Sequence, residues 1–384
     1  MAAKGKFFDR QTLAAFATLI GTAIGAGLFG LPYVASRAGF FPAMTLMFLL
    51  ALLMLISNLM YGEIILRTRG NCRLVGCAHR YLGEKGGHIT SFTSFLSLYS
   101  GNLVYIILSG IFLSSFLSPI LGGDEFTYAI IAFAFVSLVT YLDTNIFSLF
   151  ESWMVLVMLI IIATVSSKGV PYIDMANYLT SEPSQFFFPF GVMLFSLGAS
   201  SAVPEIVRIV TRRRERIVNI LSWGTMVYTL FYAIFIAAVV GVTGAETSEE
   251  AFRGLSIAVG DGVITAGFVL GFLAIITSYL VSNIAIKEIL QFDYGMKTGP
   301  AWFLSCIVPL LLFLLGFRDF IKVINFAGGI TGGLIGILII IIFYNAKRKG
   351  DRKPEYTIDV SYEISFLMII VYILGIIYEI IYDL

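Results

Sequence analysis

The sequence predicts an all-α integral membrane protein with about 11 transmembrane helices. Of its 384 residues, 58% are hydrophobic and only 13% are charged. Soluble domains carry about 25% charged residues, so this chain lacks the polar surface of a water-soluble protein. The chain also contains long apolar runs, for example at 44–60, 130–141 and 335–344. Helices need about 20 apolar residues to cross a bilayer, and these runs lack the alternation expected of β-barrel strands.

Eleven apolar segments predict membrane spans, and we expect the whole chain, 1–384, to form one membrane domain. The expected spans are 11–35, 40–66, 89–121, 127–142, 146–167, 186–210, 217–242, 256–290, 300–316, 320–345 and 361–382. Residues 1–10 form a short tail, and the N-terminal sequence MAAKGKFFDRQ lacks the features of a cleaved signal peptide.

The basic residues indicate how these spans are oriented. If the N-terminus is cytoplasmic, the inner segments and the adjoining helix ends hold 20 of the 25 Lys and Arg residues. Cationic loops resist translocation, so this bias sets topology. We therefore expect a multi-pass protein of the plasma membrane with a cytoplasmic N-terminus and an extracellular C-terminus. Basic runs such as TRRRER are interpreted as topology determinants, and nucleic acid is not an expected partner.

The first span contains the stretch GTAIGAGLFGLP, which begins at Gly21. Its G-x-G-x-x-G match does not indicate a nucleotide loop, because no strand precedes it and no acid follows about 20 residues later. Taken alone, Gly21 and Gly25 favour close helix packing. Span six has a corresponding weak point in FSLGASSAVPE, where Pro204 follows Gly198.

These two segments open two five-helix halves, 11–167 and 186–345, and they cross the membrane in opposite directions. Corresponding helices interrupted by Gly or Pro in two inverted halves indicate the midplane site of a transporter. The remaining span, 361–382, is an additional C-terminal helix. The sequence therefore favours two deliberately broken helices.

A helix break exposes N–H groups at the start of its second half and carbonyl groups at the end of its first half. In span one, the N–H groups of Ala26, Gly27 and Leu28 would form a site for a carboxylate, aided by the helix dipole. Carbonyl groups at 21–24 and 195–198 would accept hydrogen bonds from an ammonium group or bind a cation. A zwitterion matches this arrangement, so the expected ligand is an amino acid.

Span eight contributes adjacent hydroxyl groups at Thr277 and Ser278. Such residues in membrane helices often bond to a carbonyl of the preceding turn and do nothing more. Beside the carbonyls of a broken span one, they would also suit a hard cation such as Na⁺. Both interpretations stay open.

Four motifs together resemble the amino acid/auxin permease family of the amino acid–polyamine–organocation superfamily, which includes aromatic and neutral amino acid permeases. They are GTAIGAGLFGLPY with the following AGF, FSLGASSAVPE, TSYL in span eight and INFAGGITGG in span ten. The resemblance implies a LeuT-type fold, with a 5+5 inverted repeat, discontinuous helices 1 and 6, and one extra C-terminal helix.

The resemblance also implies roles for the residues at the breaks. Substrate-binding residues would be Thr22, Gly25, Ala26, Gly27, Phe195, Ser196, Gly198 and Ala199. Tyr99, Asn102 and Tyr105 lie at helical spacing on span three, where they would face either the substrate or a lipid or core surface. A sodium site would use the backbone oxygens of Gly21, Ile24 and Ala274 and the hydroxyls of Thr277 and Ser278.

Two acidic residues are candidates for gating or coupling. Glu63 would accept hydrogen bonds from the N–H groups of the span-six break, as the resemblance implies, or would pair with Arg67 one turn away. Glu205 would carry a proton, as intramembrane acids often do, or would pair with Arg208.

The predicted function is a secondary active transporter of amino acids that works by alternating access. Neutral, apolar or aromatic substrates are favoured, and the coupling ion is Na⁺ or H⁺. The alternative is a membrane amino-acid sensor with the same site and little or no transport. We expect no enzyme activity, no cofactor and a monomer in the lipid bilayer. Cys72, Cys77 and His79 match no common zinc spacing, and three cysteines do not predict a disulfide framework.

Overall fold

The computed structural model describes residues 9–70, 72–142, 159–160, 162–180, 182–255, 260–292 and 294–382, and the regular elements in these ranges are helices. Seven of the described helical segments are long and apolar enough to cross a membrane, and the bent pair at the N-terminus makes an eighth. Two shorter apolar helices coincide with the fourth and ninth expected spans. The fifth expected span, 146–167, lies mostly outside the described residues, with helical backbone at 162–167.

The first half of the chain supplies five helices. They are α1 (Arg10–Ala23), α2 (Gly27–Ala38), α3 (Phe40–Arg67), α4 (Leu74–Leu121) and α5 (Glu125–Tyr141). The helix α4 begins well before the expected span because it merges two helical segments across a kink at Gly83, whose φ is 77°. Glycine adopts this left-handed conformation without steric cost, so the kink falls at this residue.

The second half begins with a span in three pieces, α7 (Phe190–Ser196), η4 (Ser200–Ala202) and α8 (Val203–Ile209). The following spans are α9 (Ile217–Thr243), α11 (Asp261–Phe292) and α12 (Thr298–Leu314). The next span is also composite, because a π-helix, η8 (Phe326–Gly332), joins α13 (Phe320–Asn325) to α14 (Gly333–Lys349). The chain ends with α15 (Tyr362–Tyr382). Short 3₁₀ turns, η1 (Val170–Tyr172), η2 (Met175–Tyr178), η3 (Pro183–Gln185), η5 (Arg214–Arg216), η6 (Gly244–Glu246) and η7 (Arg253–Leu255), lie in the connections.

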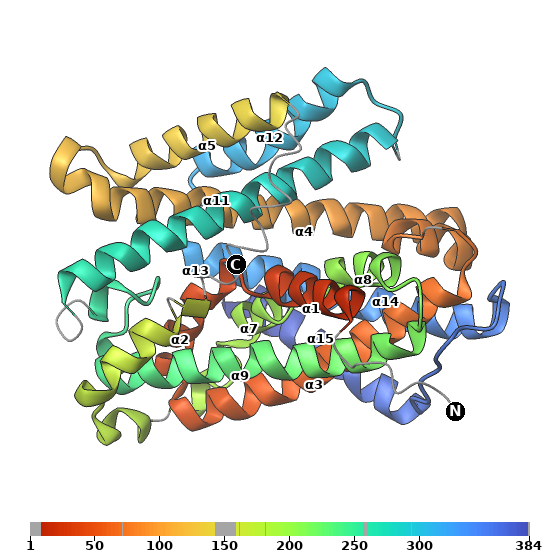
Figure 1. Cartoon of the computed structure of the whole chain (residues 1–384), viewed down its shortest axis with the longest axis horizontal. Helices are drawn as coiled ribbons and strands as arrows, with labels where there is room; N and C mark the ends of the chain where they lie inside the picture. The colour runs from red at the N-terminus through yellow and green to blue at the C-terminus, as the bar shows by residue number, and fades with distance from the viewer. Residues whose placement is uncertain are drawn as a thin grey trace.

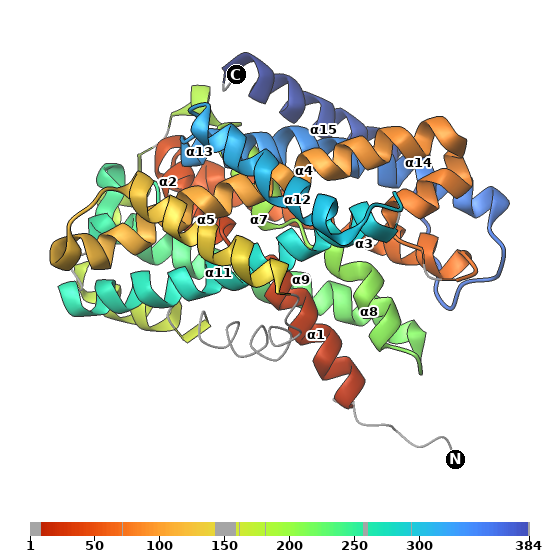
Figure 2. The same cartoon turned by 90° about the horizontal axis from the view of Figure 1, so that it is seen from above.

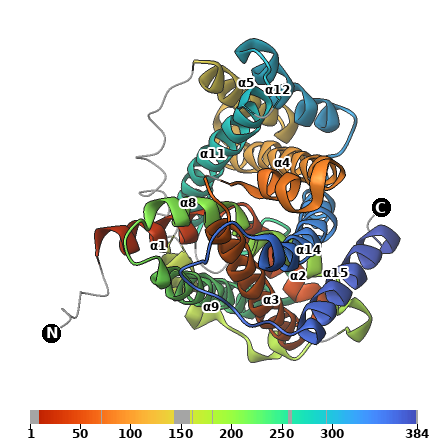
Figure 3. The same ribbon diagram turned by 90° about the vertical axis from the view of Figure 1, so that its right-hand side faces the viewer.

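The helices form two groups that run along the long axis of the molecule (Figure 1). Seen from one end, α4, α5, α11 and α12 gather on one side, while α1, α3, α8 and α9 gather on the other (Figure 3). The helix α15 lies on the opposite side of the bundle from α1 (Figure 2). Both breaks belong to spans that pack against α9.

The outer surface carries large apolar side chains that a soluble protein would bury. On α3, Phe48, Leu49 and Leu52 are each more than half exposed, and on α15 the same holds for Phe366 and Leu367. Exposed apolar patches of this extent are typical of membrane interaction sites. These faces are therefore suited to contact lipid.

Close packing of the glycines in span ten joins the π-helix to α7. A Cβ atom built on Gly328 would lie 1.9 Å from the carbonyl oxygen of Gly191 and 2.7 Å from the nitrogen of Phe195. Contacts this short leave no room for any side chain. The INFAGGITGG motif therefore brings two backbones into direct contact, which small residues permit in membrane helices.

This packing predicts different outcomes for two alanine substitutions in the π-helix. Gly328→Ala is expected to destabilise the protein by about 1–3 kcal/mol, the usual cost of overpacking. Gly332→Ala is the matched control, because its added methyl group would lie 3.6 Å from the nearest atom, at ordinary van der Waals distance. Thermal unfolding of both variants in detergent measures the difference, and equal melting temperatures would contradict the packing described here.

Candidate binding site at the two helix breaks

The first span breaks between Ala23 and Gly27, where α1 and α2 are bent by 54° relative to each other. Ile24 adopts an extended conformation, with φ −79° and ψ 92°, which ends α1. The next hydrogen bond of the chain is a tight turn from the Leu28 N–H to the Gly25 carbonyl, at 3.2 Å. Within the described residues, the N–H groups of Gly25, Ala26 and Gly27 donate to no backbone acceptor. Leu28, expected to help bind a carboxylate, is thus engaged, and Gly25 takes its place.

The sixth span breaks after Ser196, as the sequence predicts. The chain turns through two short bonds, from Gly198 N–H to the Phe195 carbonyl at 3.1 Å and from Ala199 N–H to the Leu197 carbonyl at 3.0 Å. Pro204 then lies in the first turn of α8. Proline is tolerated there because its missing N–H would have no helical partner in that turn. Both predicted interruptions are therefore present.

The two breaks contact each other directly. A Cβ atom built on Gly27 would lie 2.2 Å from Ser196 Oγ and 2.9 Å from Ser196 Cα. Gly27 is therefore needed for the close approach of α2 to the end of α7, and its backbone faces protein. Gly25 is more open, since the nearest atom to its Cβ position is the Tyr105 hydroxyl oxygen, at 4.0 Å.

The helix α9 joins the two breaks through a tyrosine that the sequence analysis did not identify. The hydroxyl of Tyr232, a fully buried residue, lies 2.5 Å from the Ala23 carbonyl oxygen and 3.1 Å from the Ser196 carbonyl oxygen. It donates its proton to this pair of carbonyls, which end the first halves of both broken spans. One turn earlier, the Tyr228 hydroxyl lies 3.4 Å from the Leu197 carbonyl oxygen.

The helix α4 faces the first break with Tyr105 rather than with the two residues named above. Tyr105 is partly buried and stacks on Tyr279 of α11, with ring centroids 6.1 Å apart. Gly101 lies one turn earlier on the same face, and no atom comes within 4 Å of its Cβ position. Open space therefore adjoins this face of α4, between the scaffold helices and the break.

The other two span-three candidates have different environments. Tyr99 stacks on Phe95, 6.0 Å away, in a separate apolar cluster with residues of α11 and α12. It does not reach the breaks. Asn102 is fully buried, and its amide nitrogen and oxygen have no hydrogen-bond partner among the described residues. An unsatisfied buried amide is costly, so Asn102 is suited to bind water or ligand.

The hydroxyl groups at the breaks bond mostly to their own helices. Thr22 Oγ1 donates to the Thr18 carbonyl at 2.8 Å, and Ser196 Oγ donates to the Val192 carbonyl at 2.7 Å. Phe195 and Gly198 are partly exposed, whereas Ala199 is buried. The partly exposed pair therefore lies where a ligand could contact it.

The residues of the expected sodium site are only partly disposed to bind an ion. The carbonyls of Gly21 and Ile24 accept no backbone hydrogen bond outside the helices in the described part of the chain. Thr277 Oγ1 donates to the Ala274 carbonyl at 2.8 Å, and Ser278 is partly buried. No hydrogen bond between described residues joins the two groups, so the sodium site stays a prediction.

Glu63 pairs with Arg67 and not with the span-six break. Its carboxylate accepts a hydrogen bond from Arg67 Nε at 2.7 Å and another from the backbone N–H of Ile358, also at 2.7 Å. Glu63 is fully buried. It therefore attaches the end of α3 to the segment between α14 and α15. Glu205 forms an exposed ion pair with Arg208, 2.5 Å away.

A basic cleft of about 690 Å³ opens at this end of the molecule. Its lining includes Arg69, Arg73, Glu205, Arg208, Glu288 and Arg352. A second cleft, of about 740 Å³, lies at the other end of α4 and includes Asp124, Glu125 and Arg253. Neither cleft is lined by the residues of the breaks.

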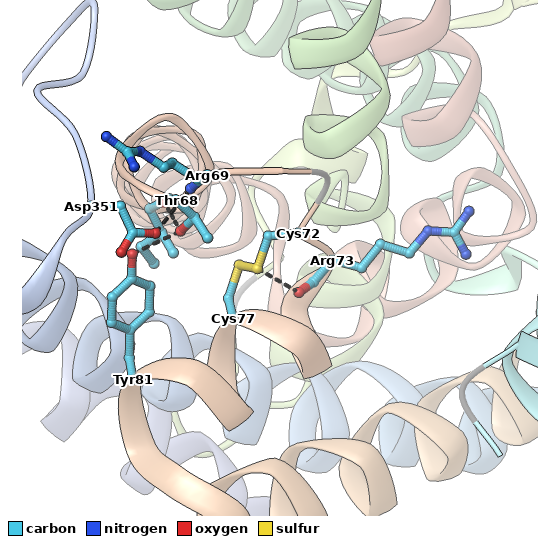
Figure 4. The surroundings of a disulfide bond; sticks show 8 residues. Thr68, Arg69, Cys72, Arg73, Cys77, Tyr81 and Asp351 are labelled. Carbon is cyan, nitrogen blue, oxygen red and sulfur yellow. Dashed lines mark hydrogen bonds between the residues drawn. A yellow bond between two sulfur atoms is a disulfide. The ribbon is translucent and has the colours of Figure 1, made fainter.

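Contacts of Asp351 hold the loop after α14 to the basic end. The Arg69 N–H donates to its carboxylate at 3.0 Å, and Arg80 forms an ion pair with it (Figure 4). The hydrogen bond from Arg69, together with that from Arg80, lowers the pKa of Asp351 below its ordinary value. This carboxylate therefore stays ionised at neutral pH and keeps both partners.

Cys72 and Cys77 form a disulfide beside these contacts (Figure 4). The sequence analysis expected no disulfide framework, and this single bridge closes one short loop at the start of α4. His79 does not join the two cysteines. It lies against His88, with ring centroids 5.6 Å apart.

Comparisons with known proteins agree with this architecture. Glutamine transporter 2 of Aliivibrio fischeri is 22% identical over 81% of this chain and 83% of its own length. Tyrosine-specific transport system 1 of Haemophilus influenzae is 23% identical over 83% and 84%, and the tryptophan-specific transport protein of Shigella flexneri is 26% identical over 58% and 55%.

A solved structure, that of MhsT in complex with L-phenylalanine, aligns with a TM-score of 0.67 and 13% identity over 98% of this chain and 99% of that one. This likeness establishes the LeuT-type fold. The chain is a multi-pass amino-acid permease. Because the tryptophan/tyrosine permease family matches residues 9–380, the chain belongs to that family.

Proposed function

We propose that this permease binds one amino acid between α4 and the two helix breaks. The observation that supports this most is the set of N–H groups at Gly25, Ala26 and Gly27, which open α2 beside the Tyr105 hydroxyl. Backbone donors at a helix start favour an anion, so they would bind the substrate carboxylate. The Gly21 and Ile24 carbonyls would accept hydrogen bonds from the ammonium group.

The proposed substrates are aromatic amino acids, with other neutral amino acids as weaker ligands. The family description and the names of two relatives, for tyrosine and tryptophan, support this choice. Another relative is named for glutamine, so the family name alone does not decide the side chain. Phe195, partly exposed at the break, offers a ring against which an aromatic side chain would pack.

Purified protein in liposomes tests this function. Preloading with one amino acid should allow counterflow of labelled tyrosine, tryptophan or phenylalanine, and excess unlabelled aromatic substrate should compete. A protein that exchanges none of the twenty amino acids would refute the proposal. Exchange of small polar amino acids alone would retain transport but overturn the substrate class.

Transport is proposed to be coupled to Na⁺ or H⁺, and Thr277 and Ser278 distinguish the two. If Na⁺ binds at their hydroxyls with the Gly21 and Ile24 carbonyls, Thr277→Ala together with Ser278→Ala should abolish stimulation by Na⁺, because two oxygen ligands are lost. Initial uptake with and without Na⁺ measures this. Thr164→Ala is a suitable control, since that hydroxyl bonds to its own helix and is exposed. Unchanged Na⁺ stimulation in the double variant would eliminate this sodium site.

Several wider features of the protein belong to the same proposal. The basic cleft at one end and the acidic residues at the other support a cytoplasmic N-terminus and an extracellular C-terminus. We infer membership of the wider amino acid/auxin permease group, a monomer surrounded by lipid, and transport without enzyme chemistry or a cofactor. The five-plus-five repeat would then place each break at the start of one half.

A further inference from the structure

Two carboxylate side chains are almost wholly buried within the described spans, those of Glu63 and Glu379, with exposed fractions of 0% and 1%. Glu63 is accounted for by its ion pair with Arg67 and its bond from Ile358. Glu379, on α15, belongs to no motif identified in the sequence. Ionisable groups inside a membrane are expensive and are usually functional, so this residue requires an explanation.

Glu379 lies in a space that two glycines make available. A Cβ atom built on Gly191 of α7 would lie 2.6 Å from Glu379 Oε1, and one built on Gly329 of the π-helix would lie 2.8 Å from the same oxygen. Any side chain at either position would displace the carboxyl group. The carboxyl group therefore contacts the first half of the broken sixth span and the π-helix at the same time.

Asn325 places the same site next to the hydrogen-bonding pattern of α7. Its backbone Cα lies 2.7 Å from the Gly191 Cβ position, and its side-chain Oδ1 accepts a hydrogen bond from the Val192 N–H at 3.0 Å. The π-helix begins at the next residue, Phe326. Local π-helices occur frequently at functional sites. The carboxyl group of Glu379 is thus held where α7 and the irregular part of span ten meet.

The elements packed against this site bring little charge to it. The residues of α7 (FGVMLFS) and of the π-helix (FAGGITG) include no ionisable side chain. The basic residues of α14 are at its far end, where Tyr344 bonds to Ser365 of α15. Ser365 and Glu379 are 14 residues apart, about 21 Å along a helix.

The remaining titratable groups around the site belong to α15 itself or to the start of α13. Tyr378 and Tyr382 stack on each other at 4.7 Å, and Tyr372 lies two turns away, bonded to Ser57. Asp319 and Lys322 are at the exposed start of α13. The surroundings therefore favour a carboxyl group that exchanges a proton.

We propose that Glu379 is a proton-binding site that couples H⁺ to the movement of α7. With a proton bound, the neutral acid packs between α7 and the π-helix, as described here. When the proton leaves, the carboxylate must gain water, and this requires α7 and the π-helix to separate. Because α7 ends at the substrate site, proton binding and substrate binding favour the same arrangement, and the coupling is reciprocal.

The proposal rests on the proposed transport function, and the Glu379→Gln variant tests it. Glutamine resembles the protonated acid in shape and cannot titrate. Wild-type protein should bind its aromatic substrate about tenfold more tightly at pH 5.5 than at pH 8, within the usual range of such coupling. E379Q should bind tightly at both pH values, keep counterflow, and lose accumulation driven by an inward proton gradient.

Glu205→Gln is the matched control, because Glu205 is exposed and paired with Arg208. It should retain proton-driven accumulation. Should E379Q fail to fold, Glu379→Asp provides a second test: it still titrates but is one methylene shorter, so its pH profile should shift while accumulation persists. An unchanged profile in E379D counts against the site.

The outcomes separate this site from the function itself. E379Q that still accumulates substrate with wild-type pH dependence would overturn the role of Glu379. Wild-type protein that transports with Na⁺ and shows no pH dependence would also overturn it and would leave the permease function intact. Wild-type protein that exchanges no amino acid would refute the function on which the proposal rests.

Discussion

Gly25→Leu is expected to abolish amino-acid binding while the protein still folds. The Cβ position of Gly25 has no atom closer than the Tyr105 hydroxyl oxygen at 4.0 Å, and the φ of Gly25 is not positive, so a side chain can extend into the open space. That side chain would occupy the place of the carboxylate. Loss of two hydrogen bonds to a charged group costs about 3 kcal/mol or more, so affinity should fall on the order of 100-fold.

Equilibrium binding of labelled tyrosine or tryptophan measures this effect, and thermal unfolding verifies the fold. Gly27→Leu is the contrasting variant. Its side chain would collide with the Ser196 backbone, which lies 2.9 Å from the Cβ position. We therefore expect that variant to be destabilised, so it cannot test binding alone. Wild-type affinity in Gly25→Leu would show that the carboxylate binds elsewhere.

Tyr232→Phe is expected to weaken substrate binding by about tenfold. The change removes the hydroxyl that donates to the Ala23 and Ser196 carbonyls and leaves the buried ring in place. Two buried acceptors then lose their donor, a cost of about 1–3 kcal/mol. Because these carbonyls end the first halves of both broken spans, the relative position of the two breaks should become less well defined.

Substrate affinity and the KM of uptake measure this, with Tyr228→Phe as the matched control. Tyr228 lies one turn away on the same helix, and its hydroxyl is 3.4 Å from the Leu197 carbonyl oxygen, so its loss should have a smaller effect. Equal effects of the two substitutions would argue against a special role for Tyr232. An effect on stability without any effect on affinity would make Tyr232 structural only.

Much of this architecture could be predicted because membrane helices are specified locally. Apolar length determines each span, and glycine or proline weakens a helix wherever it stands. Ten of the eleven expected spans therefore contain described helices, and both breaks occur at the predicted residues. The π-helix in span ten was not predicted, because GGITGG permits several close-packed arrangements and only the contact with Gly191 selects one.

The side-chain partners could not be predicted in the same way. Tyr105 and Tyr99 share one helix at similar spacing, yet only Tyr105 lies at the break, because helix rotation decides which residue faces it. Glu63 had two alternatives, and the loop at Ile358 favours the pair with Arg67. Tyr232 and Glu379 belong to apolar segments without a motif, so their importance depends on residues about 200 and 190 positions away.

By itself the sequence determined the membrane class, the spans, the two weak points and the amino-acid ligand class. These depend on composition and on short-range backbone chemistry, which act within a few residues. Only the tertiary structure decided that Gly27 contacts Ser196, that Tyr232 joins the two breaks, and that Glu379 lies between Gly191 and Gly329. Those contacts depend on how whole helices pack and rotate, and many arrangements are compatible with one apolar pattern.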